Sequence, residues 1–173
     1  MRGLLKSAAA LLGLAAAPLA ADSSINERRE VMNSAHAFFG ALRSADKTAL
    51  ARHMIPDGTI FVHDRKNPDA PRVDAVPVAD HLKRWENSPQ NIVEWVRFET
   101  VLVDGDMAQI WGPYYFTIAG KLTHCGTNSL SMVKTDDGWK VANTSFTMEA
   151  PETCDDIVKR VQESFVRTVP DPR

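Results

Sequence analysis

The stretch MAQIWGPYYFTIAGKLTHCGTNSLSMVKTDDGWKVANTSFTM, residues 107–148, decides the fold, because it holds three long β-rich runs joined by short turns. β-branched and aromatic residues fill the runs and favour strands, and residues 119–121 and 135–138 are turn signals. Upstream, residues 91–103 form another β-rich run, and Asp-Gly-Asp at 104–106 predicts a hairpin. We therefore predict a meander of four long antiparallel strands.

The preceding part of the chain has the pattern of helices. Residues 25–46 carry one apolar stripe at helical spacing, which consists of Val31, Met32, Ala35, Phe38, Phe39 and Leu42. Asp46 is placed to cap a second, short helix, residues 59–63 read as a strand, and Asp80–Asn87 reads as a third helix. Between them, residues 64–77 form a polar loop with three prolines.

Helices segregated from an antiparallel sheet define an α+β fold. A long curved sheet wrapped around the first helix would form a cone with an open mouth. Gly112, Pro113 and Gly126 interrupt long strands, so we predict bulges or kinks at these positions.

Composition restricts the class of protein. With 173 residues, 44% of them hydrophobic, the chain is long enough for one domain with a real core. Its formal net charge is −2, with both signs scattered, and no run of Lys or Arg supplies the footprint that phosphate neutralisation needs. We therefore expect no nucleic-acid partner.

The first 21 residues have the layout of a bacterial secretory signal peptide. Arg2 and Lys6 precede an Ala/Leu run, and Pro18 and small residues follow it. The apolar run is shorter than the roughly 20 residues that a membrane span needs. We expect cleavage after Ala20 or Ala21, a periplasmic or secreted protein with no membrane association after signal removal, a domain at 22–154, and a tail at 155–173 with room for a short helix.

Export changes the interpretation of the two cysteines, Cys125 and Cys154. In an oxidising compartment an even pair tends to close. A disulfide here would close a loop of about 30 residues and contribute about 3 to 4 kcal/mol in the chain-entropy model. Two inert thiols, or a nucleophile with His124 as its base, are the alternatives. Adjacent strand residues point to opposite faces, which disfavours the second alternative.

Four quoted segments resemble a known superfamily: FFGALRSADKTALARHMIPDGTIFV at 38–62, VDGDMAQIWGPYYF at 103–116, GKLTHCG at 120–126 and DGWKV at 137–141. They are similar to nuclear transport factor 2-like (SnoaL-like) proteins, and most similar to exported bacterial members, some of which carry the label lumazine-binding. The resemblance spans residues 27–154 and implies a cystatin-like α+β cone, often a homodimer through the outer sheet face.

The resemblance does not imply one activity, because function on a shared fold comes from the site. Ketosteroid isomerases of this superfamily use a Tyr in the first helix and a carboxylate at the end of the first strand. Here the helix position holds Phe38, and the strand ends in Val62, His63 and Asp64, so the acid is displaced. Isomerase chemistry is therefore in doubt.

The β-rich run that begins at Leu122 suggests a polar patch inside the cone. Leu122, His124, Asn128, Leu130 and Met132 share a face, as do Trp139, Val141, Asn143 and Ser145. Buried imidazole and amide groups need hydrogen-bond partners, from a ligand or from the protein itself. We predict a ligand pocket formed by Trp85, Trp111, Tyr115, His124, Asn128, Asn143 and Ser145, and a self-satisfied polar network is the alternative.

The candidate catalytic residues are His124, His63 and Asp64. His63 and Asp64 could form an acid–base pair, although neighbours on a strand point apart. The five histidines show no ligand spacing, and we expect no metal and no cofactor. The leading hypothesis is an exported domain that binds a small apolar or aromatic ligand. The alternatives are an isomerase, lyase or hydrolase that uses a pocket histidine, and a dimeric scaffold.

Overall fold

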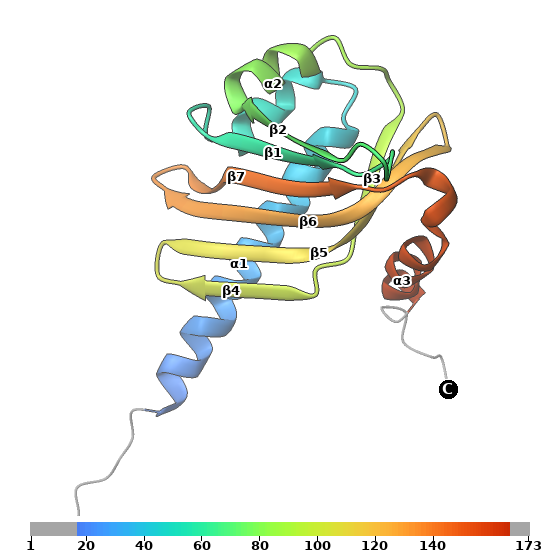
Figure 1. Ribbon diagram of the computed structural model, residues 1–173. Coiled ribbons are helices and arrows are strands. Elements are labelled where there is room, and N and C mark those ends of the chain that lie inside the picture. The colour runs from blue at the N-terminus through green and yellow to red at the C-terminus, as the bar shows by residue number, and fades with distance from the viewer. Residues whose placement is uncertain (1–16, 167–173) are drawn as a thin grey trace, which may run out of the picture.

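The computed structural model describes residues 17–166. Its elements, in chain order, are α1 (Ala17–Arg43), the 3-10 helix η1 (Lys47–His53), β1 (Thr59–Asp64), β2 (Arg72–Pro77), α2 (Val78–Trp85), β3 (Ile92–Val96), β4 (Thr100–Asp104), β5 (Met107–Ile118), β6 (Lys121–Thr135), β7 (Gly138–Met148), the 3-10 helix η2 (Pro151–Thr153) and α3 (Asp155–Val166). Helices and one large sheet segregate, so the fold class is α+β, as predicted. Figure 1 shows α1 running behind strands β4 to β7.

The sheet is mixed rather than purely antiparallel. Its strand order is β2-β1-β7-β6-β5-β3, and β4 also pairs with β5. β5, β6 and β7 form the predicted antiparallel meander. However, β1 pairs with β7 in parallel, with Ile60 opposite Thr144. The prediction of an antiparallel sheet is therefore wrong at this pair. The chain leaves β1, forms the other strands, and returns in β7, which runs beside β1 in the same direction.

Two further strand predictions need correction. The predicted polar loop at 64–77 contains β2, which pairs with β1 along its whole length. The predicted long strand at 91–103 is broken into β3 and β4, which both pair with β5. The connection between them passes over Gly112, where an added Cβ would lie 1.8 Å from the Arg97 carbonyl oxygen. Gly112 thus permits a close backbone approach, and its pairing with Asn128 is regular rather than bulged.

The sheet is irregular at two other places. The register between β5 and β6 shifts between Phe116 and Thr117, opposite Thr123. The register between β6 and β7 shifts so that Ser131 pairs with Asn143 and the next residue pairs with Val141, which leaves Ala142 as an extra residue. Such β-bulges bend a strand and reverse the facing of the residues beyond them.

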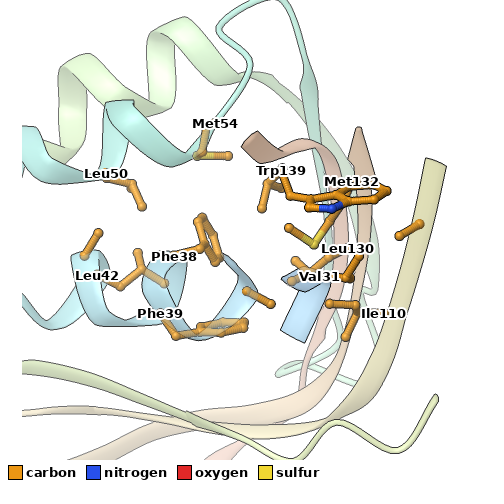
Figure 2. Close-up of a cluster of buried hydrophobic side chains, with 14 of the residues drawn as sticks. Val31, Phe38, Phe39, Leu42, Leu50, Met54, Ile110, Leu130, Met132 and Trp139 are labelled. Atoms are coloured by element: carbon orange, nitrogen blue, oxygen red, sulfur yellow. The ribbon is translucent and has the colours of Figure 1, made fainter. Parts of the chain in front are cut away.

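The core lies between α1 and the concave face of the sheet (Figure 2). The predicted helical stripe faces this core, where Val31, Ala35, Phe38, Phe39 and Leu42 are at most 5% exposed. Burial of such side chains contributes about 1.5 to 3 kcal/mol each for the larger ones. The amphipathic helix therefore packs into the sheet because its apolar residues recur on one side.

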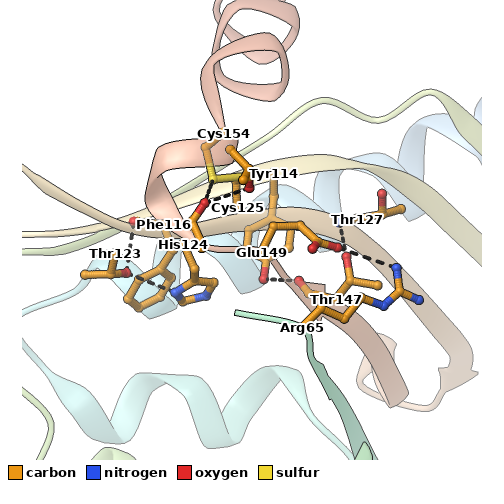
Figure 3. Close-up of a disulfide and its surroundings, with 12 residues drawn as sticks. Arg65, Tyr114, Phe116, Thr123, His124, Cys125, Thr127, Thr147, Glu149 and Cys154 are labelled. Carbon is orange, nitrogen blue, oxygen red and sulfur yellow. Dashed lines mark hydrogen bonds and ion pairs between the residues drawn. A yellow bond between two sulfur atoms is a disulfide. The ribbon is translucent and has the colours of Figure 1, made fainter. Parts of the chain in front are cut away.

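A disulfide joins Cys125 in β6 to Cys154, just before α3 (Figure 3). This confirms the predicted bridge. Both residues are fully buried, and α3 packs against β5 and β6. Trp95 of β3 contacts Phe165 of α3 at 5.2 Å between ring centroids. The bridge and this contact hold α3 on the face of the sheet opposite α1.

Most of the predicted signal peptide, residues 1–16, lies outside the described residues. Within the described part of the chain, no helix is both long enough and apolar enough to cross a membrane.

Candidate functional site

The concave side of the sheet encloses a cavity of about 180 Å³ between α1, α2 and the strands. Its wall is mostly apolar, and six of the lining side chains are Phe, Tyr or Trp. The lining consists of Phe38, Phe39, Leu42, Met54, Ile60, His81, Trp85, Glu94, Tyr114, Phe116, His124, Asn128, Leu130, Thr144, Phe146 and Met148. Three groups in this wall carry polar chemistry of interest: the carboxyl of Glu94, the amide of Asn128 and the imidazole of His124.

Glu94 of β3 is a buried carboxyl in the cavity wall, with only 8% of its surface exposed. The Asn128 amide donates a hydrogen bond of 2.6 Å to its Oε1 atom. Burial raises the pKa of Glu94 to about 7, while the Asn128 hydrogen bond and the charge of Arg43 act in the opposite direction. Near neutral pH this carboxyl therefore exchanges between a hydrogen-bond donor and an anion.

His124 of β6 projects into the same cavity and stacks on Phe116, with ring centroids 4.9 Å apart. Its Nδ1 atom lies 2.9 Å from the Thr123 hydroxyl (Figure 3). Burial and the charge of Lys66 lower the pKa of His124 to about 4, against the opposite influence of Asp64. The ring is therefore uncharged at neutral pH.

Tyr114 forms part of the wall without offering a proton to the cavity. Its hydroxyl donates a 2.7 Å hydrogen bond to the Thr147 carbonyl, and burial raises its pKa above the ordinary value. The phenol thus ties β5 to β7 across the intervening strand.

Three of the seven residues predicted for a ligand pocket line this cavity: Trp85, His124 and Asn128. Asn143 and Ser145 do not. The extra residue Ala142 in β7 reverses the facing beyond it, so Thr144 and Phe146 take the inward positions. Asn143 is exposed and accepts a hydrogen bond from the Thr59 backbone.

Trp111 and Tyr115 are also absent from the cavity wall, because both lie at the odd positions of β5. Ile110 and Tyr114 face inward, and strand alternation then turns their neighbours outward. Trp111 is 51% exposed. Tyr115 lies opposite Trp95 and Cys125, on the face that carries α3.

The candidate pair His63 and Asp64 is separated by the same alternation. His63 Nε2 lies 2.9 Å from the Ser145 hydroxyl. Asp64 is buried and forms ion pairs with Arg72 at 3.0 Å and Lys66 at 3.8 Å. Among the described residues neither His63 nor His124 hydrogen-bonds a carboxylate, so an acid–base pair centred on either histidine lacks its second member.

Sequence reasoning missed Glu94, the most unusual group of the site. The signal was nevertheless present in Ile92-Val93-Glu94-Trp95-Val96, where the carboxyl shares a face with two aliphatic residues. A charged residue at an inward position of a β-rich run is either a functional group or a charge that protects an edge strand from pairing with other chains. Glu94 lines the cavity, which favours the first interpretation.

The α2 side of the cavity is closed by an aromatic stack. His81 and Trp85 lie 5.5 Å apart between ring centroids. Lys47 of η1 places its ammonium 5.4 Å from the centre of the Trp85 ring, and within the described structure this ammonium and the Trp85 indole nitrogen have no hydrogen-bond partner. Within residues 17–166, no three His, Cys, Asp or Glu side chains gather in a way that could hold a metal ion.

Comparison of the sequence with protein-family models and with curated proteins finds no match. Solved structures with the same fold do exist. An NTF2-like protein with a cystatin-like fold from Novosphingobium aromaticivorans is 18% identical, with 79% of this chain and 92% of that chain covered and a TM-score of 0.57.

Two other structures agree with this one. An NTF2-like protein of unknown function from Shewanella baltica is 15% identical, with coverage of 72% and 94% and a TM-score of 0.55. A protein with a cystatin-like fold from Nostoc punctiforme is 9% identical, with coverage of 71% and 91% and a TM-score of 0.55. The chain therefore has the cystatin-like fold of NTF2-like proteins, as the sequence resemblance implied.

Proposed function

We propose that this chain is an exported protein that binds a small, largely apolar ligand in the cavity of its cone. The cavity itself carries the proposal, since it combines an aromatic wall with a few polar groups, which is the usual make-up of a small-molecule site. Its volume of about 180 Å³ is of the same order as the roughly 150 Å³ cavity that takes up benzene in an engineered protein. A ligand of about one ring fits this space.

Two observations support export. Residues 1–21 have the order of segments found in secretory signal peptides. The disulfide between Cys125 and Cys154 belongs to a class of bond that persists in oxidising compartments and is rare in the cytosol.

Methionine methyl groups provide a direct test of where a ligand binds. Met54 and Met148 line the cavity, whereas Met107 lies outside it and is 59% exposed. We would label the methionine methyls with carbon-13 and titrate the protein with toluene. Binding in the cavity is expected to shift the resonances of Met54 and Met148 with one shared dissociation constant and to leave Met107 unchanged.

A filled variant serves as the control. Leu130→Phe adds side-chain volume to the wall and should weaken toluene binding, while Leu102→Phe changes a side chain that is 62% exposed and should not. The proposal is wrong if toluene and related single-ring compounds leave Met54 and Met148 unshifted in the folded protein.

A further inference from the structure

His124 presents an unprotonated nitrogen to the cavity, and the surrounding hydrogen bonds determine which nitrogen this is. The Thr123 hydroxyl donates its one proton to the Phe116 carbonyl at 3.1 Å. The same oxygen lies 2.9 Å from His124 Nδ1. Donation to the carbonyl leaves the hydroxyl only a lone pair for His124, and this arrangement assigns the ring proton to Nδ1. In a neutral ring Nε2 then has only a lone pair.

The position of Nε2 makes it available to a ligand. His124 lines the cavity, and the Thr123 hydroxyl occupies the Nδ1 side of the ring, which leaves Nε2 as the nitrogen that a ligand in the cavity can approach. No donor among the described residues hydrogen-bonds this atom. This nitrogen is not one of the buried polar atoms that lack a partner in the described structure, so it keeps accessible surface, and a donor on the ligand would complete its hydrogen bonding where water is excluded.

The charges around the cavity disfavour an anionic ligand. Glu94 contributes a carboxyl to the wall, and the charged groups that influence His124 are Lys66 and Asp64, which are paired with each other. An anion would therefore enter an apolar space beside a carboxyl, and among the described residues no Lys or Arg belongs to the lining. The Lys47 ammonium lies 5.4 Å from the Trp85 ring but is not part of the wall. An uncharged ligand avoids this cost.

The wall favours a flat ring. Phe116 already stacks on the His124 imidazole, and the Tyr114 ring meets the imidazole edge-on at 5.7 Å. Phe38, Trp85 and Phe146 extend this surface around the cavity. Aromatic rings pack well in offset or edge-on arrangements against such side chains.

We propose that the ligand is a neutral single-ring aromatic compound with a hydroxyl, a phenol, which donates its proton to His124 Nε2. This inference rests on the proposed binding function and adds the chemical class of the ligand. The binding step forms one hydrogen bond and breaks no covalent bond. Glu94 and the Asn128 amide also line the cavity, and they could form hydrogen bonds with a second polar substituent on the ring.

Three matched probes separate the contributions. p-Cresol has the donor, 4-methylanisole keeps the oxygen but lacks the donor, and toluene lacks both. The ether is the less strongly hydrated of the two oxygen compounds, so without a specific acceptor it should enter an apolar cavity more readily. With the acceptor present, we expect p-cresol to bind roughly five- to tenfold more tightly than 4-methylanisole in methionine-methyl titrations.

Two variants locate the effect. His124→Phe keeps a ring in the wall, removes the acceptor and should abolish the preference for p-cresol while toluene still binds. Thr123→Val removes the group that fixes the tautomer and should reduce the preference. His63→Phe alters a histidine that hydrogen-bonds Ser145 outside the cavity and should leave the preference unchanged.

The outcomes distinguish the two proposals. Equal affinity of the unmodified protein for p-cresol and 4-methylanisole, with toluene bound at Met54 and Met148, overturns the assignment of a phenol and leaves the binding function intact. If none of the three probes shifts these methyl groups, both proposals fail. The comparison of probes needs no variant, so it does not depend on whether His124→Phe folds.

Discussion

Glu94 and His124 are held in unusual protonation states by the same cause, which is burial in an apolar wall. Burial disfavours the charged form of each group, so it raises the pKa of the acid to about 7 and lowers the pKa of the base to about 4. At neutral pH the imidazole is uncharged and the carboxyl is about half protonated. The cavity wall therefore has two polar groups but no pair of opposite full charges.

Glu94→Gln tests the state of the carboxyl. The folded pKa of about 7 exceeds the ordinary value of 4.5, so the folded state retains a proton that the unfolded state releases. Glu94 therefore contributes an energetic penalty that grows as the pH rises from about 4.5 to 7 and then stays constant at about 3 kcal/mol. Gln keeps the shape and the acceptor for Asn128. Urea unfolding at pH 8 should show the variant to be more stable, and the advantage should vanish near pH 4.

The difference between variant and parent matters here because His124 acts in the opposite direction. Its folded pKa lies below the ordinary 6.5, so its contribution to stability falls as the pH drops from 6.5 towards 4. The contribution of His124 is the same in the variant and the parent, so it cancels when their free energies of unfolding are subtracted. Glu163→Gln, an exposed change in α3, should give no difference at any pH. A Glu94→Gln advantage that is independent of pH would contradict the raised pKa.

Strand alternation explains which site residues could be predicted from the sequence. The rule places His124 and Asn128 in the interior, because Leu130 and Met132 share their face, and both residues line the cavity. The same rule failed for Asn143 and Ser145, because a bulge leaves no clear pattern in the residues that form it. Glu94 obeys the same alternation, but a single carboxylate in a β-rich run does not by itself indicate that it faces a cavity.

At the scale of elements, the bulge in β7 depends on a glycine far away in sequence. A Cβ added to Gly58 would lie 1.7 Å from the Ala142 carbonyl oxygen. Ile55 also donates a backbone hydrogen bond of 2.8 Å to Val141. The turn before β1 therefore packs against the backbone of the β7 bulge, and this close contact is possible only because residue 58 has no side chain.

Gly58→Ala should consequently be severely destabilising. Because the obstruction is backbone rather than the end of a flexible side chain, we expect a loss of about 3 kcal/mol or more in the free energy of unfolding. Gly40→Ala is the matched control, since an added Cβ there meets nothing within 4 Å and the site lies in α1, where Ala is favoured by about 0.5 to 1 kcal/mol. Urea titrations followed by circular dichroism would measure both, and a Gly58→Ala loss no larger than the Gly40→Ala change would refute the packing argument.

The elements themselves were largely predictable, and their pairing was not. The stripe from Val31 to Leu42 and the β-rich runs after residue 91 produce clear periodicity, because each buries one face. The sequence does not indicate β2, because three of its six residues are charged or proline and it lies in a Pro-containing stretch. The parallel pairing of β1 with β7 leaves no local trace, since it joins segments more than 80 residues apart.

At the scale of the whole molecule, the disulfide fixes a helix to the outer face of the sheet. Cys125 and Cys154 are 29 residues apart in sequence, and the segment between them includes all of β7. Arg160 of α3 adds a hydrogen bond of 2.9 Å to Glu99 beyond the end of β3. The bridge thus stabilises the contact between α3 and the sheet rather than the cavity wall.

Replacing both cysteines with alanine should separate these two parts. The closed loop predicts a loss of about 3 to 4 kcal/mol in the free energy of unfolding. Hydrogen exchange should rise first in α3, while the amides of β5 and β6 near the cavity keep most of their protection. The parent protein treated with reductant should behave in the same way. Equal loss of protection in α3 and β6 would show instead that the bridge supports the whole fold.

The parallel pairing of β1 with β7 has a consequence for how the protein folds during synthesis. Residues 59–64 are synthesised early, yet they lie beside residues 144–148 in the finished sheet. Thr144, Phe146 and Met148, which close one wall of the cavity, belong to this late segment. The hollow therefore does not exist in any nascent chain that ends before Met148, and a polypeptide threaded through a translocation channel from its amino terminus would complete it only after nearly all of its length had emerged.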